Sequence, residues 1–131
     1  MRLGRDRRVR KRPEFEQAQR EGRRIPTPHF VLIVAVSPAA QAGARLGITA
    51  SRKVGNAVRR NRLKRMIRAA FRETQGFLPA GYDLIVICRR DDEKLTSDGV
   101  VREWRREKHR IERAAQAAGE RASTAAVVEP A

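Results

Sequence analysis

The most informative segment of the chain reads SRKVGNAVRRNRLKRMIRAAFRET, residues 51–74. Its apolar residues recur at intervals of three and four, which predicts a helix over residues 56–74 with one buried side. At about 100° per residue, several of its cations fall directly opposite that side. The predicted buried stripe consists of Leu63, Met66, Ile67, Ala70 and Phe71. This helix therefore has one side for packing and one for contacts with another molecule.

The segments on either side of this helix predict a small sheet. Residues 29–36 (HFVLIVAV) and 45–51 are expected to be strands that pair as an antiparallel hairpin. Residues 82–88 (YDLIVIC) show no alternation after Asp83, which is typical of a strand covered on both faces. The order helix, strand, strand, helix, strand, helix predicts the α+β class, as a two-layer α/β sandwich with a small, mostly antiparallel sheet.

The remaining segments define the ends of the domain. Residues 1–12 form a basic N-terminal arm, and residues 13–118 are expected to form a single domain. A short helix begins at Pro13 and ends near Gly22, while a closing helix begins near Ser97. The closing helix carries Val100, Val101, Trp104 and Ile111 on one side. Residues 119–131 are mostly small and are predicted to be a disordered tail.

The charge of the chain favours a polyanionic partner. Its 131 residues contain 30 Lys and Arg against 15 Asp and Glu, a net charge of +15 that binding to nucleic acid would relieve. An acidic membrane surface is the second choice, although the apolar runs are too short to cross a bilayer. Cys88 is the only cysteine, which excludes an intramolecular disulfide and a cysteine-based zinc site. The N-terminus lacks the apolar stretch of a signal peptide, so we expect a cytoplasmic protein.

The basic helix is the strongest candidate for the binding surface. Residues 52–72 contain nine cations and no Asp or Glu. The alternative interpretation is a solvent-facing side, but such sides usually mix charges because oppositely charged pairs stabilise a helix. Phosphate binding is therefore the preferred interpretation, and Asn56 at the predicted helix start could cap it and leave backbone N–H groups for a phosphate.

The same segment resembles the signature of bacterial ribonuclease P proteins, whose core is Arg-Asn-Arg, here residues 60–62. The similarity extends over about twenty residues and continues outside them. Glu14-Phe15, Phe30-Val31-Leu32 and Gly81-Tyr82-Asp83 also resemble the family. The resemblance implies a ribosomal-protein-like fold in which a left-handed βαβ crossover runs through the basic helix.

The resemblance also implies a function. In this family a catalytic RNA with bound Mg²⁺ removes the 5′ leader of precursor tRNA, and the protein binds both that RNA and the leader. The implied partners are ribonuclease P RNA, in a 1:1 complex, and precursor tRNA, with no membrane. The protein itself is expected to hold no tight cofactor, because the Mg²⁺ is used by the RNA.

Two groups of residues would carry this function by resemblance. The first, in and before the basic helix, would bind RNA: Arg52, Lys53, Asn56, Arg59, Arg60, Asn61, Arg62, Lys64, Arg65 and Arg68. The second would line the leader-binding cleft: Phe15, Gln19, Val31 and Ile33. Phe15 could stack on bases or simply pin its helix to the sheet. Gln19 and Ile33 stand where family members usually have aromatic residues, which predicts a smaller stacking surface.

No catalytic or metal-binding residues are predicted in the protein. His29 and His109 are the only histidines, and neither has a sequence neighbour suited to acid–base chemistry. Cys88 lies in an apolar run and is expected to be an inert thiol, while residues 91–93 (DDE) favour a solvated loop over a magnesium contact.

Three rival functions remain at this stage. A structural RNA-binding protein, such as a ribosomal protein, would share the charge and the fold class. A metal-free ribonuclease would need the two histidines as acid and base. A membrane-surface protein would need the apolar stripe that the predicted helix uses to cover the sheet.

Overall fold

The computed structural model describes residues 7–38 and 43–128 and contains one four-stranded sheet. Its strands are β1 (Arg23–Pro26), β2 (Phe30–Val36), β3 (Arg45–Thr49) and β4 (Tyr82–Cys88). Their order across the sheet is β1-β2-β4-β3. Strand β2 pairs antiparallel with both β1 and β4, whereas β3 lies parallel to β4. The mixed α+β class and the small sheet are as predicted.

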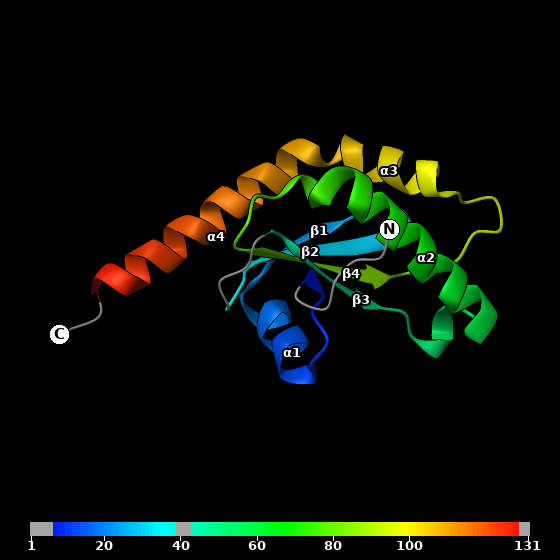
Figure 1. The fold of residues 1–131 in the computed structure, drawn as a ribbon, viewed down its shortest axis with the longest axis horizontal. Helices are drawn as coiled ribbons and strands as arrows, with labels where there is room; N and C mark the ends of the chain where they lie inside the picture. The colour runs from blue at the N-terminus through cyan, green and yellow to red at the C-terminus, as the bar shows by residue number, and fades with distance from the viewer. Residues whose placement is uncertain (1–6, 39–42, 129–131) are drawn as a thin grey trace.

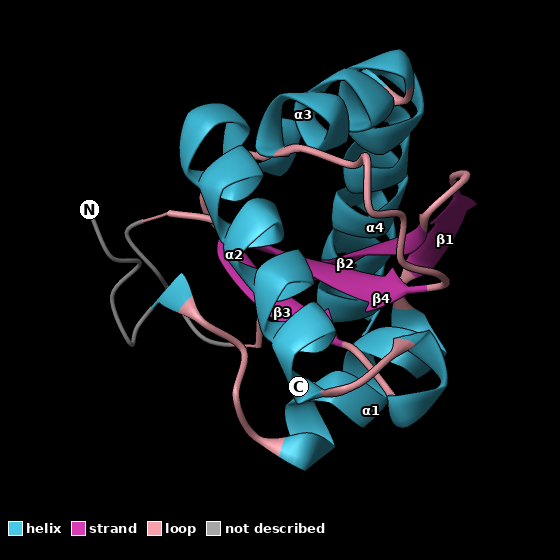
Figure 2. Ribbon diagram, turned by 90° about the vertical axis from the view of Figure 1, so that its right-hand side faces the viewer, coloured by secondary structure: helices cyan, strands magenta, loops and turns pink. Residues whose placement is uncertain are grey.

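Helices cover both faces of this sheet (Figure 1). One face carries α2 (Ala57–Thr74), α3 (Ser97–Arg106) and α4 (Lys108–Val128), and the other carries α1 (Arg12–Glu21). Figure 2 shows α2 and α3 side by side above the sheet, with α1 below it. Short 3₁₀ turns at Arg52–Val54 and Gln75–Phe77 flank α2. Helix α1 therefore adds a partial third layer to the expected two.

The core has two parts, one on each face of the sheet. The larger lies under α2, α3 and α4 and contains Phe30, Leu63 and Trp104, each fully buried. The smaller lies under α1 and contains Ile33, Ile85 and Ala18. Because alternate residues of β4 enter different parts of the core, this strand is covered on both faces, as its uninterrupted apolar run predicted.

Helix α2 forms where its periodicity predicted. Asn56 caps it, since its side chain accepts a hydrogen bond from the Arg59 backbone N–H at 3.0 Å. The five residues of the predicted stripe are all buried. The helix ends at Thr74. Its C-cap Gln75 has a φ of 54°, and Gly76 follows with a φ of 63°, a left-handed conformation that glycine adopts without strain.

The pairing predicted for the first two strands is wrong. Strands β2 and β3 do not form a hairpin, because β4 lies between them and pairs with both. The connection from β3 through α2 to β4 is therefore the parallel crossover that the family resemblance implies; its left-handedness stays a prediction. Strand β1 was not predicted at all. It is a short edge strand with two arginines and a proline, a composition that hides strand periodicity.

The two ends of the domain also differ from the expectation. The closing helix is two helices, separated at Glu107, and α4 continues to Val128 through most of the stretch expected to be disordered. The basic arm is partly docked: Val9 is buried and its N–H donates to the Leu46 carbonyl oxygen at 2.8 Å. Residues 1–6 and 129–131, the ends of the predicted arm and tail, lie outside the described residues.

Within the part of the chain that the structure describes, no helix is long and apolar enough to span a bilayer.

Candidate nucleic-acid interface

The outer side of α2 carries the cations that the sequence placed there. Asn61 and Arg65 are exposed, and Arg60, Lys64 and Arg68 are partly exposed. Because Leu63 and Ile67 anchor the opposite side without any exposure, these side chains are presented on a rigid helix. Ahead of the helix, Arg52 and Lys53 are also exposed, in the 3₁₀ turn that the buried Val54 fixes to the domain. Seven of the ten predicted RNA-binding residues therefore line the outer side of α2 or the turn before it, with side chains that reach solvent.

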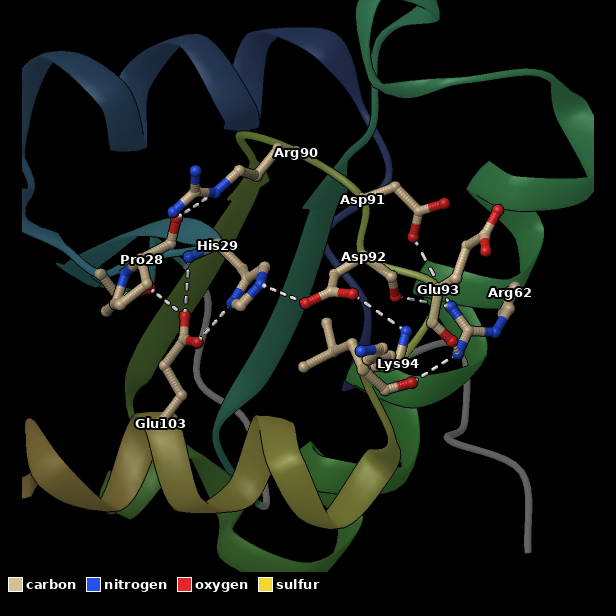
Figure 3. Close-up of polar contacts among 11 residues, drawn as sticks. Pro28, His29, Arg62, Arg90, Asp91, Asp92, Glu93, Lys94 and Glu103 are labelled. Atoms are coloured by element: carbon tan, nitrogen blue, oxygen red, sulfur yellow. Dashed lines mark hydrogen bonds and ion pairs between the residues drawn. The ribbon is translucent and has the colours of Figure 1, made fainter.

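The other three have structural partners. Asn56 uses its side-chain oxygen to cap α2. Arg59 forms ion pairs with Asp91 at 3.3 Å and Glu93 at 2.8 Å. Arg62 donates to the backbone oxygens of Asp92 at 3.3 Å, Glu93 at 3.1 Å and Leu95. The acidic loop of residues 91–95 thus lies against the N-terminal half of α2, where Arg62 holds it by its backbone (Figure 3).

This loop contact is what sequence reasoning missed about Arg62. The residue was expected to contact RNA, and its side chain is only 35% exposed, with much of its donor capacity used within the domain. Residues 62 and 92 are thirty apart in the chain. Their contact follows from the position of β4 beside β3, which the sequence did not reveal.

The predicted leader-binding residues lie on the other face of the sheet, around α1. Phe15 and Val31 are partly buried. Each packs against the smaller core and leaves part of its side chain exposed to solvent. Gln19 is exposed, but Ile33 is fully buried and has no surface to offer. Assigning Ile33 to direct leader contact is therefore wrong; it supports the surface from beneath. Ile87 of β4, the register partner of Val31, is partly exposed and packs against the same smaller core.

Close packing at Gly47 fixes Phe15 against the sheet. A Cβ atom at position 47 would lie 2.7 Å from Ile85 Cδ1 and 3.0 Å from both Phe15 Cε1 and Val9 Cβ. Any side chain there would displace the Phe15 ring or the docked N-terminal segment. The absence of a side chain at Gly47 is therefore required for the position of Phe15.

A buried ion-pair network fixes the start of α1. The Arg45 guanidinium donates to both carboxylate oxygens of Asp83 at 2.8 Å and to Glu14 of α1 at 3.0 Å. The Asp83 hydrogen bond raises the pKa of Arg45 further above its ordinary value. Burial acts to raise the pKa of Glu14, but Arg45 and the backbone N–H groups of Lys11 and Arg10 outweigh it, so that pKa is lowered. Helix α1 is thus attached to β3 and β4 by charge as well as by apolar contacts.

The histidines do not form a catalytic pair. His29 Nδ1 lies 2.7 Å from Glu103 of α3, and its backbone N–H donates to the same carboxylate at 2.9 Å (Figure 3). His29 Nε2 faces Asp92 at 3.5 Å. His109 is exposed on α4. Burial raises the pKa of the Cys88 thiol to about 11, which keeps it protonated at neutral pH and unreactive as a nucleophile.

Metal-binding side chains do not gather in the described residues. No group of three or more His, Cys, Asp or Glu there is arranged to hold an ion. Asp91 and Glu93 are instead occupied by Arg59, and Asp92 lies beside His29 and accepts from the Lys94 backbone N–H. These carboxylates are therefore engaged within the domain.

Comparisons with known proteins agree with this arrangement. A family model described as ribonuclease P matches residues 3–112. The ribonuclease P protein component of Oleidesulfovibrio alaskensis is 40% identical over 103 residues, which cover 77% of this chain and 82% of that protein.

Two solved structures share the fold. The RNase P protein of Staphylococcus aureus matches with a TM-score of 0.67 and 28% identity, covering 82% of this chain and 96% of its own. That of Thermotoga maritima, in complex with 1-(4-fluorophenyl)-2-thiourea, matches with a TM-score of 0.65 and 32% identity, covering 79% and 98%. Because the family model covers the basic helix, the whole sheet, α1 and α3, the chain belongs to the family of bacterial ribonuclease P protein components.

Proposed function

We propose that the outer side of α2 binds ribonuclease P RNA and that the surface beside α1 holds the 5′ leader of precursor tRNA. Family membership makes the chain the protein subunit of an RNA-based endoribonuclease, with ribonuclease P RNA as its partner. The proposal adds where each RNA lies and that one protein binds one RNA.

The observation that carries the proposal is the uncompensated charge on and just before α2. Arg52, Lys53, Arg60, Lys64, Arg65 and Arg68 form no ion pair in the described residues, while the acidic loop neutralises only Arg59 and Arg62. Six cations on one rigid surface repel one another unless an anion lies between them. A phosphate backbone supplies such anions at regular spacing.

The leader surface differs in chemistry from the α2 surface. Phe15, Val31 and Ile87 present partly exposed apolar groups beside α1. Bases of a single strand can stack or pack on such groups without regard to sequence, which suits a leader that varies between tRNAs. The polar Gln19 adds a hydrogen-bonding group at the same surface.

Hydrolysis of the leader phosphodiester belongs to the RNA. Mg²⁺ held by that RNA would supply the metal-assisted step, and the protein residues bind and orient the two RNA strands. His29 is held between two carboxylates that attach it to α3 and to the loop after β4, and His109 is exposed on α4.

The salt dependence of RNA binding tests the α2 assignment. Six phosphate contacts predict that affinity falls about a thousandfold between about 50 and 200 mM monovalent salt. Filter binding of the purified protein to ribonuclease P RNA measures this directly. Arg65→Ala should reduce the logarithmic slope by about one, because one contact is lost. A nearly flat salt response would contradict phosphate binding by α2.

A further inference from the structure

A basic pocket lies at the β3 edge of the sheet, between the docked N-terminal segment and α2. Four cations surround it: Arg8, Arg10, Lys64 and Arg68. Its apolar floor is formed by Val9, Leu46 and Ile48. No carboxylate lines it, in contrast to the acidic loop that covers Arg59 and Arg62.

Arg8 lines one side of the pocket, and both of its neighbours in the chain are bonded to the domain. Arg7 donates to the Ala44 carbonyl oxygen at 2.7 Å and also to the Gln75 side chain, beyond the end of α2. On the other side, the Val9 N–H donates to Leu46. The backbone of Arg8 is therefore held in place beside α2, whereas a free basic arm would leave it mobile.

The charges in this pocket lack a counter-charge. Arg8 Nε is buried without a hydrogen-bond partner in the described structure. Burial lowers the pKa of Arg68, and the nearby charges of Arg8 and Arg72 lower it further. A buried N–H without an acceptor and two neighbouring like charges both cost free energy, so the fold holds these groups together at the expense of stability. An anion that accepts from both would remove that cost.

We propose that this pocket binds one nucleotide of a single-stranded RNA segment, with its phosphodiester between Arg8 and Arg68 and its base or ribose on the apolar floor. This inference rests on the proposed RNA-binding function and adds a specific site to it. The pocket lies at the β3 edge of the sheet: Leu46 and Ile48 of its floor pack with the larger core, whereas Val9 packs with Phe15 in the smaller core. Its four cations come from the N-terminal segment and α2, and none of the residues assigned to the leader surface lines it. The nucleotide could come from ribonuclease P RNA or from the precursor, and both present the same phosphodiester.

The test uses Arg8→Gln, Arg68→Gln and the double variant in the full-length protein. Arg102→Gln is the matched control, because Arg102 is exposed on α3 and does not line the pocket. Affinity is measured separately for ribonuclease P RNA and for leader-bearing precursor tRNA. Each single variant should weaken binding of one of these RNAs about tenfold, the loss typical of a hydrogen bond to a charged group. The affected RNA identifies the source of the nucleotide.

The double variant distinguishes two arginines that bind the same phosphate from two arginines that attract RNA independently through their charge. If both arginines hold the same phosphodiester, the double variant should lose little more than either single variant, because their contributions are coupled. The control should change affinity less than about twofold. A loss at Arg8→Gln no larger than that of the control, in a wild-type protein that binds RNA normally, would overturn the pocket and leave the proposed function intact, because Arg68 would then contact RNA as part of the α2 surface alone. Failure of the wild type to bind either RNA would overturn both.

Thermal unfolding without RNA provides a second readout. Arg68→Gln should raise the Tm, because it removes a partly buried charge that Arg8 and Arg72 repel, and a merely structural arginine would lower it. Inorganic phosphate should raise the Tm of the wild type and of Arg102→Gln more than that of Arg68→Gln. A lower Tm together with unchanged RNA affinity in Arg68→Gln would show that Arg68 is structural and would overturn the proposal.

Discussion

Arg62 and Arg65 lie on the same helix and carry the same charge, yet the structure predicts different consequences when each is replaced. Arg62 donates three hydrogen bonds to backbone oxygens of the loop after β4. Arg65 is exposed. Arg62→Ala should therefore destabilise the folded domain, whereas Arg65→Ala should leave its stability unchanged and weaken RNA binding.

The size of the effect follows from those contacts. A hydrogen bond with a charged donor contributes about 1.5–3 kcal/mol when buried and less when solvent shares it. Because the Arg62 side chain is 35% exposed, we expect about 1–2 kcal/mol for the set. In a domain of this size that corresponds to a decrease in Tm of about 4–8 °C. Arg65→Ala should change the free energy of unfolding by less than about 0.5 kcal/mol.

Circular dichroism melts of the three proteins measure this difference, and Arg62→Lys makes the test sharper. Lysine keeps the charge but lacks the planar guanidinium group that donates to several carbonyl oxygens at once, so it should recover little of the lost stability. A melt of Arg62→Ala that coincides with the wild type would refute the structural role of Arg62. Full rescue by lysine would show that its charge matters more than its hydrogen bonds.

Three further substitutions test other parts of the structure. Phe15→Ala should lower affinity for leader-bearing precursor tRNA more than for mature tRNA in a binding assay with the reconstituted holoenzyme, and equal losses would contradict a leader contact. Since the pKa of Glu14 is lowered in the folded protein, its pairing with Arg45 stabilises the fold above the ordinary value of 4.5 and is lost as the pH falls through the lower folded value. Urea unfolding at pH values between about 3 and 6 should therefore show a smaller acid-side loss of stability for Glu14→Gln than for the wild type; parallel curves would argue against the pairing. Glu103→Gln should destabilise the fold by about 1–3 kcal/mol, because the buried carboxylate accepts from both the ring and the backbone of His29. An unchanged melting temperature would show that this contact contributes nothing.

Local sequence patterns predicted the helices and strands that depend only on residues close together in the chain. Helix α2 follows from its stripe and from Asn56 at its start, and β4 follows from its uninterrupted apolar run. The outer cations of α2 follow from the same periodicity. These features need only the geometry of a single helix or strand.

Features that depend on distant residues could not be predicted in this way. The insertion of β4 between β2 and β3 is a long-range pairing, and the parallel crossover through α2 leaves no trace in either strand. The hairpin prediction failed because proximity in sequence was taken for proximity in the sheet. Strand β1 was missed because it is short and polar, with only Ile25 facing the core.

The same limit applies to the candidate site. Glu103 and His29 are far apart in the chain, and so are Arg62 and the loop that it holds. Arg8 appeared only as part of a basic arm, since nothing in residues 1–12 shows that Val9 would dock beside Leu46. The sequence thus predicted which residues face outward from α2 but not which of them are already engaged.

Reconstitution tests the central claim most directly. The purified protein is added to a bacterial ribonuclease P RNA and a precursor tRNA at low Mg²⁺, beside protein-only and RNA-only controls. We predict cleavage at the mature 5′ end only when both components are present, because the protein positions the RNAs and the RNA performs the hydrolysis. Cleavage by the protein alone would contradict this division of roles, and tight RNA binding without cleavage in the mixture would instead indicate a structural RNA-binding protein.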